Sequence, residues 1–300
     1  MILWISVAID LAFGDPTNRY HPVRWLGNFI SFFSPFFRKL SNNAVSGFLF
    51  LLFVLAVFTT AVFLIQRFAA LQIILYIMLS ALMLKYTFAL KSMPGHIRPI
   101  LESLRNGEID KARLHLSMVV RRPTSNLDVP HILGACIETL SEGFVDGFGA
   151  VVLYYGIFGI LGSVAARVIN TLDSMIGYRD ELNIQFGKAS AWADTILNFI
   201  PARLSAIPFI LGARLMGNKV AFSAIRREAS LTESRNAGWP MGTIALALDV
   251  KLEKINHYCL NSSGHEPDFL SVQRSIRLFY LADIVFLLMA TAEILCLTLI

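Results

Sequence analysis

The sequence carries little charge for its length. Only 16% of its 300 residues are Asp, Glu, Lys or Arg, whereas 55% are hydrophobic, and the mean hydropathy is +0.60. A soluble domain has about 25% charged and roughly 45–50% apolar residues. This composition argues against an ordinary soluble domain and predicts that the lipid bilayer is the protein's main surroundings.

Cysteine is scarce as well. Cys136, Cys259 and Cys296 form no C-x-x-C pair, which argues against a zinc site or a dithiol redox site. The chain also lacks a G-x-x-x-x-G-K-[ST] string, so a P-loop is excluded as its nucleotide site. The net charge of +5 comes from basic residues that flank apolar runs, which is typical of membrane proteins and predicts no nucleic-acid partner.

Apolar runs of about 20 residues are long enough to cross a bilayer as helices. Residues 44–65 contain no charge and are predicted to span the membrane. Residues 68–90 form a second predicted span, in which Lys85 near the end snorkels toward the headgroups. Residues 278–300 form another, whose Asp283 and Glu293 face protein or the interface.

We therefore predict an all-α fold: a polytopic integral membrane helical bundle, one domain over residues 1–300, with polar cytoplasmic loops and interfacial helices. Basic residues cluster in segments 91–122 and 219–277, which places these loops on the cytoplasmic side of the cell (inner) membrane.

The charge-free segment 147–166 leaves two arrangements open. It crosses the membrane and the chain returns through 198–216, or neither segment crosses fully and both pack on the cytoplasmic side. The second arrangement is favoured, because the return segment is broken by Arg203, Pro208 and Arg214, and because it lets the polar clusters described below meet.

Polar residues gather near the N-terminus. Asp10 is followed by Gly-Asp15-Pro and then by His21 before a second proline. Gly14 and Pro16 predict a turn that presents the Asp15 carboxylate to a ligand or metal. A plain turn that joins two helices is the alternative.

Two further groups show helical spacing. Glu138, Glu142 and Asp146 recur every fourth residue and so share one helix face. This face is either exposed to solvent or binds Mg²⁺ through carboxylates and phosphates. Asn170, Asp173, Ser174 and Gly177 share another face. Further polar residues follow downstream: Arg179, Lys188, Ser190, Asp194, Asn198, Arg203 and the N-A-G-W-P loop that starts at Asn236.

These residues lie in strings that resemble the adenosylcobinamide-phosphate synthase (CobD/CbiB) family of cobalamin biosynthesis. The strings are D-x-x-x-G-D-P with H-P-V (10–23), R-x-T-S-x-L-D (122–128), E-T-x-x-E-x-x-x-D-G (138–147), N-T-L-D-S-M-I-G-Y-R (170–179), F-G with D-x-x-x-N-x-I-P-A-R-L (186–204) and N-A-G-W-P (236–240). The chain departs from the family's usual residues at Pro123, Gly143 and Met241, where Asp, Asn and Glu are usual.

The resemblance implies a membrane carbon–nitrogen ligase. Such an enzyme uses ATP and Mg²⁺ to join a carboxylate of adenosylcobyric acid, a corrinoid, to aminopropanol or aminopropanol phosphate, and the resemblance leaves room for a complex with other corrinoid enzymes. We predict that Glu142, Asp146 and Asp173 form the catalytic and metal-binding group. The predicted substrate- and phosphate-binding residues are Asp15, His21, Arg122, Asn170, Ser174, Arg179, Lys188, Arg203 and Asn236.

Two rival functions remain at this stage. A small-solute transporter would place Asn170 and Asp173 along a continuous path through the membrane. A non-catalytic regulatory protein, similar to the AmpE proteins related to this family, would not need its carboxylates.

Overall fold

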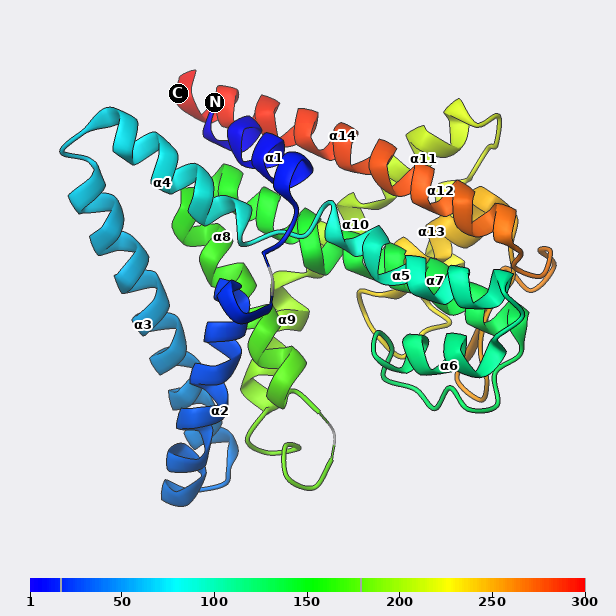
Figure 1. Ribbon diagram of the computed structural model, residues 1–300, viewed down its shortest axis with the longest axis horizontal. Helices are drawn as coiled ribbons and strands as arrows, with labels where there is room; N and C mark the ends of the chain where they lie inside the picture. Colours follow the sequence, from blue (N-terminus) through cyan, green and yellow to red (C-terminus); the bar gives the residue numbers. More distant parts are fainter. Residues whose placement is uncertain (17, 179, 300) are drawn as a thin grey trace. The chain divides into compact units, whose positions relative to one another are not determined.

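Helices make up nearly all the regular structure in the computed structural model, which describes residues 1–16, 18–178 and 180–299 (Figure 1). The chain forms two compact units. The first unit comprises Met1–Lys91, Ala150–Asn198 and Ala290–Ile300, of which residues 17, 179 and 300 are not described. The second comprises Ser92–Gly149 and Phe199–Met289.

The first unit contains six of the named α-helices in full. They are α1 (Ile2–Phe13), α2 (Pro22–Leu40), α3 (Ala44–Ala69), α4 (Ile73–Lys85), α8 (Ala150–Ile176) and α9 (Lys188–Leu197), and a short 3-10 helix η1 (Asn18–Tyr20) precedes α2. The core lies where α2, α3 and α8 meet, around Phe50, Val54 and Leu172. Asn43 caps α3, because its side-chain oxygen accepts a hydrogen bond from Ser46 N at 3.0 Å.

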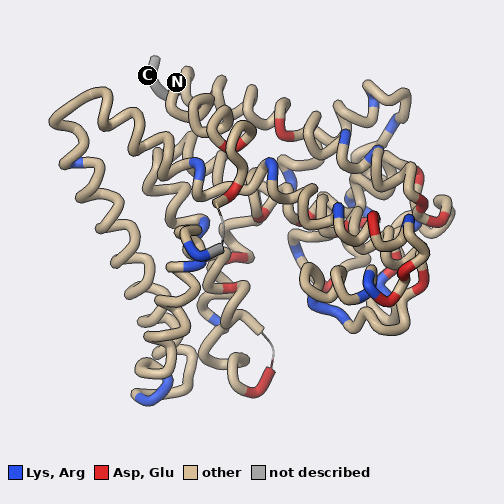
Figure 2. The backbone as a smooth tube through the Cα atoms, in the orientation of Figure 1, with Lys and Arg blue, Asp and Glu red and all other residues tan. Residues whose placement is uncertain are grey.

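Helix α3 confirms the predicted span at residues 44–65. Its 26 residues make it about 39 Å long, which exceeds a hydrocarbon core of about 30 Å. Figure 2 shows that α3 carries no acidic or basic residue before its last turn, where Arg67 lies. Apolar side chains such as Phe63 and Leu64 are exposed along it, as expected of a surface that faces lipid.

The predicted span at residues 68–90 is wrong in its length. The chain turns after α3, and α4 begins at Ile73 and ends at Lys85, so this helix of 13 residues is only about 20 Å long. Lys85 also does not snorkel outward, because its side chain is only 2% exposed and is held by carboxylates of the same unit.

The chain reverses direction within α8. Gly159 has φ 63° and ψ −154°, a backbone conformation that is essentially confined to glycine. Ser163 Oγ donates a hydrogen bond to Val151 O at 3.1 Å, although a straight helix would separate these residues by about 18 Å. Segment 147–166 is therefore not one straight helix, and the arrangement in which neither this segment nor 198–216 crosses fully stays a prediction.

The second unit is built on helices α5 (Ser92–Arg105), α6 (Ile109–Ser117) and α7 (Val129–Phe144) and on η2 (Val145–Gly149), a π-helical turn. Later helices complete it: α10 (Phe199–Leu204), α11 (Ala206–Leu215), α12 (Phe222–Ala229), α13 (Gly238–Leu248) and most of α14 (Phe269–Leu299). Its core includes Phe144, whose ring packs against Phe209 and Phe286.

Two short strands were not predicted, since the sequence was interpreted as helical throughout. Strands β1 (Leu252–Lys254) and β2 (Tyr258–Leu260) form an antiparallel hairpin in which Leu252 lies opposite Leu260 and Lys254 lies opposite Tyr258. Strand β1 packs against α7, with Leu252 and Leu260 fully buried. The hairpin thereby places Lys254 and Tyr258 near the acidic face of α7.

Three described helical stretches are long and apolar enough to cross a membrane, namely Ala44–Ala69, Val129–Ile176 and Phe269–Cys296, and the second of them contains the reversal at Gly159. The pair Lys188–Leu197 and Phe199–Leu215 makes a fourth if it is counted as one broken span. The third helix confirms the prediction for residues 278–300, and Asp283 within it is buried against protein at 1% exposure. The chain is thus a polytopic helical membrane protein, as its sequence predicts.

Candidate functional site

The predicted site residues fall into both compact units. The first unit holds Asp15, His21, Asn170, Asp173, Ser174 and Lys188, and the second holds Arg122, Glu142, Asp146, Arg203 and Asn236. Arg179 lies outside the described residues. The prediction that Asp146 and Asp173 meet concerns residues of different units, and it stays a prediction.

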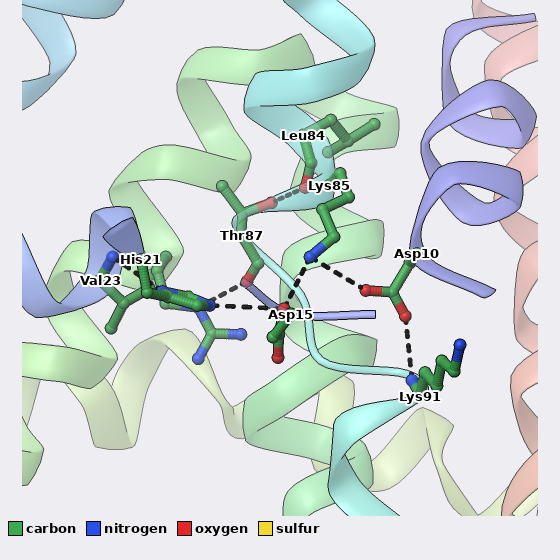
Figure 3. Close-up of polar contacts among 9 residues, drawn as sticks. Asp10, Asp15, His21, Val23, Leu84, Lys85, Thr87 and Lys91 are labelled. Carbon is green, nitrogen blue, oxygen red and sulfur yellow. Dashed lines mark hydrogen bonds and ion pairs between the residues drawn. The ribbon is translucent and has the colours of Figure 1, made fainter. Parts of the chain in front are cut away.

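Lys85 organises the polar cluster of the first unit (Figure 3). Its ammonium group lies 2.7 Å from Asp15 Oδ1 and 3.5 Å from Asp10 Oδ1. Asp10 is only 1% exposed, and its other oxygen accepts a hydrogen bond from Lys91 N at 2.9 Å. Two carboxylates near each other, one of them buried, would repel, so the lysine between them is what makes this arrangement stable.

His21 completes this cluster. Its Nδ1 accepts a hydrogen bond from Val23 N at 3.2 Å and caps α2, so the proton of the neutral ring lies on Nε2. Nε2 faces Asp15 Oδ1 at 3.4 Å. The predicted turn at Gly14 is confirmed, since this glycine has φ 66°. The Asp15 carboxylate, however, is held by Lys85 and His21, which makes it a structural link between α1, α2 and α4.

The polar face of α8 is joined to the same region through Arg167. This side chain donates from Nε to Thr87 O at 2.5 Å and from Nη1 to Asn170 Oδ1 at 3.3 Å. Asp173 and Ser174 follow on α8 and are half-buried. The chain closes tightly over Asp173, because a Cβ atom at Gly177 would overlap with the Asp173 carboxylate. The bare backbone predicted at Gly177 is therefore required by contact with Asp173.

Helix α9 carries the next group. Asn198 Nδ2 donates to both carboxylate oxygens of Asp194 at 3.1 Å, so the predicted four-residue spacing does bring these two side chains together. Lys188 begins α9 and is exposed, whereas Ser190 is fully buried.

In the second unit, Arg122 and Glu138 form a buried ion pair. The distance from Arg122 Nη2 to Glu138 Oε2 is 2.6 Å, and the two side chains are 11% and 8% exposed. The other oxygen, Glu138 Oε1, is buried and has no hydrogen-bond partner among the described residues. A buried carboxylate oxygen without a donor is costly, so this atom marks a place where a ligand or water donor would be favourable.

Glu142 lies one turn further along α7. Arg121, Arg122 and Lys254 lie close enough to interact electrostatically with its carboxylate. Asp146 lies beyond the end of α7, in the π-turn η2. A π-turn contains an extra residue and is frequent at functional sites. The predicted straight acidic stripe is thus interrupted between its second and third members.

Tyr258 borders the same cluster from the hairpin. Its hydroxyl group points to Met241 Sδ at 3.6 Å. Burial raises the pKa of Tyr258, and the neighbouring Glu138 and Glu142 carboxylates raise it further, so the phenol stays protonated and can donate a hydrogen bond. Met241 stands where the family usually has a glutamate. Because Met241 contacts Tyr258, this difference from the family lies next to the acidic cluster.

Arg203 and Asn236 are two predicted residues that do meet. Arg203 Nη1 donates to Asn236 Oδ1 at 3.3 Å, and the guanidinium carbon lies 3.4 Å from the centre of the Phe199 ring. Trp239, from the N-A-G-W-P segment, lies on the same guanidinium at 5.1 Å. Stacking of this kind orients a guanidinium group for binding an anion.

Four side chains with evident roles were not among the site residues predicted from the sequence: Lys85, Arg167, Lys254 and Tyr258. A lone charge in an apolar run, such as Lys85, is by itself a signal for a functional or structural partner. Lys254 and Tyr258 lie on strands of only three residues, which give too weak an alternating pattern for the sequence to reveal the hairpin.

The carboxylates of Glu142 and Asp146 in the second unit could bind Mg²⁺ only together with a phosphate-containing ligand. No group of three or more His, Cys, Asp or Glu side chains in the described part of the chain is placed to hold a metal ion. Mg²⁺ prefers oxygen ligands and is usually bound by one or two carboxylates together with substrate phosphates and water. Glu142 and Asp146 could supply such carboxylates, and phosphate would have to complete the shell.

Known proteins match nearly the whole chain. A family model described as CobD/Cbib protein matches residues 3–279. The probable cobalamin biosynthesis protein CobD of Thermoplasma acidophilum is 40% identical over 282 residues, which cover 94% of this chain and 93% of that protein. The cobalamin biosynthesis protein CobD of Dehalococcoides mccartyi is 39% identical over 266 residues, covering 87% and 86%. No solved structure matches.

Proposed function

The chain belongs to the CobD/CbiB protein family, and on this basis we propose that it is an enzyme of cobalamin biosynthesis. Its proposed reaction converts adenosylcobyric acid to adenosylcobinamide or its phosphate, by ATP-dependent amide formation with aminopropanol or aminopropanol phosphate. The observation that carries the proposal is the cluster of carboxylates and cations around Glu142, in which Arg122, Glu138 and Glu142 belong to the strings that carry the family resemblance.

Amide formation from a carboxylate requires that the carboxylate be activated first. In the proposed reaction a carboxylate oxygen of the corrinoid attacks the γ-phosphorus of ATP, and ADP leaves. The amine nitrogen then attacks the acyl carbon of the resulting acyl phosphate, inorganic phosphate leaves, and the ammonium proton passes to a carboxylate or to water. Both steps move negative charge, which cationic side chains can stabilise.

The residues of the chain have separate roles in this proposal. Glu142 and Asp146 hold the metal ion, and Mg²⁺, when bound, would offset the charge of the transferring phosphoryl group. Arg122 is held by Glu138 and neutralises an anionic substrate group. Arg203, fixed by Asn236 and Phe199, is suited to a second anionic group. Asp173, which lies in the first unit, is proposed as a further catalytic residue.

The direct test is a coupling assay with the purified full-length protein in detergent. Wild-type protein is expected to consume ATP and form the amide when adenosylcobyric acid, Mg²⁺ and either amine are present. Glu142→Gln keeps the shape of the side chain but removes its charge, and the rate should fall about 10²–10³-fold. Glu102→Gln is the matched control, because Glu102 is exposed and forms only a surface ion pair with Arg98.

Complementation separates this proposal from the rivals. In a strain that cannot make cobinamide, wild-type protein should restore growth, and Glu142→Gln and Asp173→Asn should not. Equal growth with all three proteins would argue against catalysis and for a regulatory role. Failure of the wild-type protein to restore growth would leave a transporter or regulator as the better explanation.

The proposal also places the polar loops on the cytoplasmic side of the cell membrane, because basic residues cluster there and ATP is a cytoplasmic substrate. Single cysteines in a cysteine-free protein test this orientation. A cysteine at Lys39, before α3, should be shielded from an impermeant maleimide in intact cells, and one at Leu71, in the exposed turn after α3, should be labelled.

A further inference from the structure

We propose that Lys254 and Glu142, with Tyr258 beside them, form a phosphate-binding subsite between the β1–β2 hairpin and α7. The inference deepens the proposed function and rests on it for the choice of phosphate ligands. It adds Lys254 and Tyr258, two residues outside the strings that carry the family resemblance.

The register of the hairpin brings these side chains to one face. Lys254 pairs directly with Tyr258 across the ladder, and Leu252 pairs with Leu260 two positions away. Directly opposed residues and residues two apart in a strand share a face. Because Leu252 and Leu260 are fully buried, Lys254 and Tyr258 point from the same packed face of the hairpin.

Lys254 and Glu142 attract each other without touching. The carboxylate of Glu142 interacts electrostatically with Lys254, yet neither side chain forms a hydrogen bond or a direct ion pair with any described residue. Both side chains are half-buried. The charges of this acid and base are therefore not joined in a closed ion pair, whereas the structural ion pair Arg122–Glu138 closes to 2.6 Å, and a ligand that contacts both can use them.

A second observation points to a ligand at the same place. Glu138 is 94% buried, since it is 6% exposed, and its Oε1 atom has no hydrogen-bond partner among the described residues. Its neighbours include Glu142 and Tyr258. The cluster therefore contains a buried carboxylate oxygen with spare acceptor capacity, near an acid and an ammonium group that form no direct ion pair with described residues.

Phosphate with its metal ion fits this combination best. Lys254 would bind a phosphate oxygen as a point charge, and the Tyr258 hydroxyl would donate a second hydrogen bond. Glu142 would bind the metal ion that accompanies the phosphate. A simple carboxylate ligand has only two oxygens to share among the metal ion, Lys254 and Tyr258, whereas a phosphate group has more.

Two phosphate sources agree with the proposed reaction, namely ATP and aminopropanol phosphate. The experiment measures equilibrium binding of each compound, with Mg²⁺ present and no corrinoid, to the full-length protein in detergent. Lys254→Gln is expected to weaken binding of at least one of them by about tenfold or more. Lys254→Arg retains the charge and should bind within about threefold of wild type.

Lys251→Gln is the matched control. Lys251 precedes β1, but its ammonium group is engaged by Glu266 at 2.6 Å and by Glu253 at 3.3 Å. This substitution should leave phosphate binding unchanged. Tyr258→Phe should weaken binding by a smaller factor than Lys254→Gln, since it removes one neutral donor. If Lys254→Gln does not fold, Lys254→Met provides the same comparison, because Lys254 has no direct partner to lose in the described part of the chain.

The outcomes are distinct from those of the coupling assay. Weaker binding of ATP by Lys254→Gln assigns the subsite to the nucleotide, and weaker binding of aminopropanol phosphate alone assigns it to the amine substrate. Unchanged binding of both compounds overturns the subsite. Wild-type protein that binds phosphate through Lys254 but forms no amide would support the subsite and refute the proposed reaction. Amide formation by Lys254→Gln at the wild-type rate would support the proposed reaction and refute the subsite.

Discussion

The ammonium group of Lys85 lies 2.7 Å from the carboxylate of Asp15, although 70 positions separate the two residues. Asp10 lies on the other side of the same ammonium group at 3.5 Å. The end of α4 is thereby tied both to α1 and to the turn before α2. An apolar helix of only 13 residues gains an anchor at its polar end through these contacts.

Lys85→Met should destabilise the protein by about 3–5 kcal/mol, because it leaves the Asp10 carboxylate buried without its cation. Unfolding in a graded detergent or denaturant series measures the loss. Lys39→Met is the control, since Lys39 is exposed at the end of α2. Adding Asp10→Asn to Lys85→Met should recover part of the stability, and equal stability of wild type and Lys85→Met would refute the anchor.

Gly177→Ala tests the contact that closes the chain over Asp173. The added Cβ would overlap with the Asp173 carboxylate, so the carboxylate must move and amide formation should fall at least tenfold. Gly95→Ala is the control, because a Cβ at Gly95 meets no atom within 4 Å. Activity of Gly177→Ala equal to that of the control would show that the position of Asp173 is unimportant.

Gly159→Ala tests the chain reversal in α8 through backbone strain alone. A Cβ at Gly159 meets nothing within 4 Å, but φ 63° with ψ −154° is unfavourable for alanine. We expect a loss of about 1–3 kcal/mol in unfolding free energy. A variant as stable as wild type would mean that the chain does not turn at this residue.

The stability of α14 should depend on acidic pH through Asp268. Its Oδ1 accepts hydrogen bonds from Ser271 N at 2.7 Å and from Ser271 Oγ, and these bonds lower the pKa of Asp268 below its ordinary value. A lowered pKa gives stability that is present above about pH 4, the unfolded value, and is lost as the pH falls through the folded value.

Asp268→Ala should therefore cost about 1 kcal/mol near neutral pH, as the loss of other helix caps does, and the difference from wild type should shrink in acid. Thermal unfolding of both proteins between about pH 3 and pH 7 measures it. Ser271→Ala, which removes the hydroxyl partner, should show a smaller difference with the same dependence on pH. A difference that does not change with pH would rule out the carboxylate as its cause.

Sequence reasoning succeeded where a single local pattern determines the structure. The uninterrupted apolar run predicted α3, and Gly14 and Pro16 predicted the turn around Asp15. Four-residue spacing predicted that Asp194 and Asn198 meet. The strings at residues 10–240 also indicated the family that the whole-chain matches establish.

Features that depend on distant partners were not predictable in this way. A lysine near the end of an apolar run has the same local pattern whether it snorkels or pairs, and only the fold brings Lys85 to Asp10 and Asp15. The reversal at Gly159 is likewise hidden, because several glycines share that apolar segment. Lys254 and Tyr258 come from strands of three residues, too short for a clear alternating pattern.

The extra residue of the π-turn at Val145–Gly149 sets where Asp146 points relative to Glu142 on α7. Ordinary helical turns accommodate one residue fewer, so a deletion here would let the helix continue regularly and would swing Asp146 around the axis relative to Glu142. The relative direction of these two side chains around the helix axis thus depends on the number of residues in the turn as well as on which residues they are.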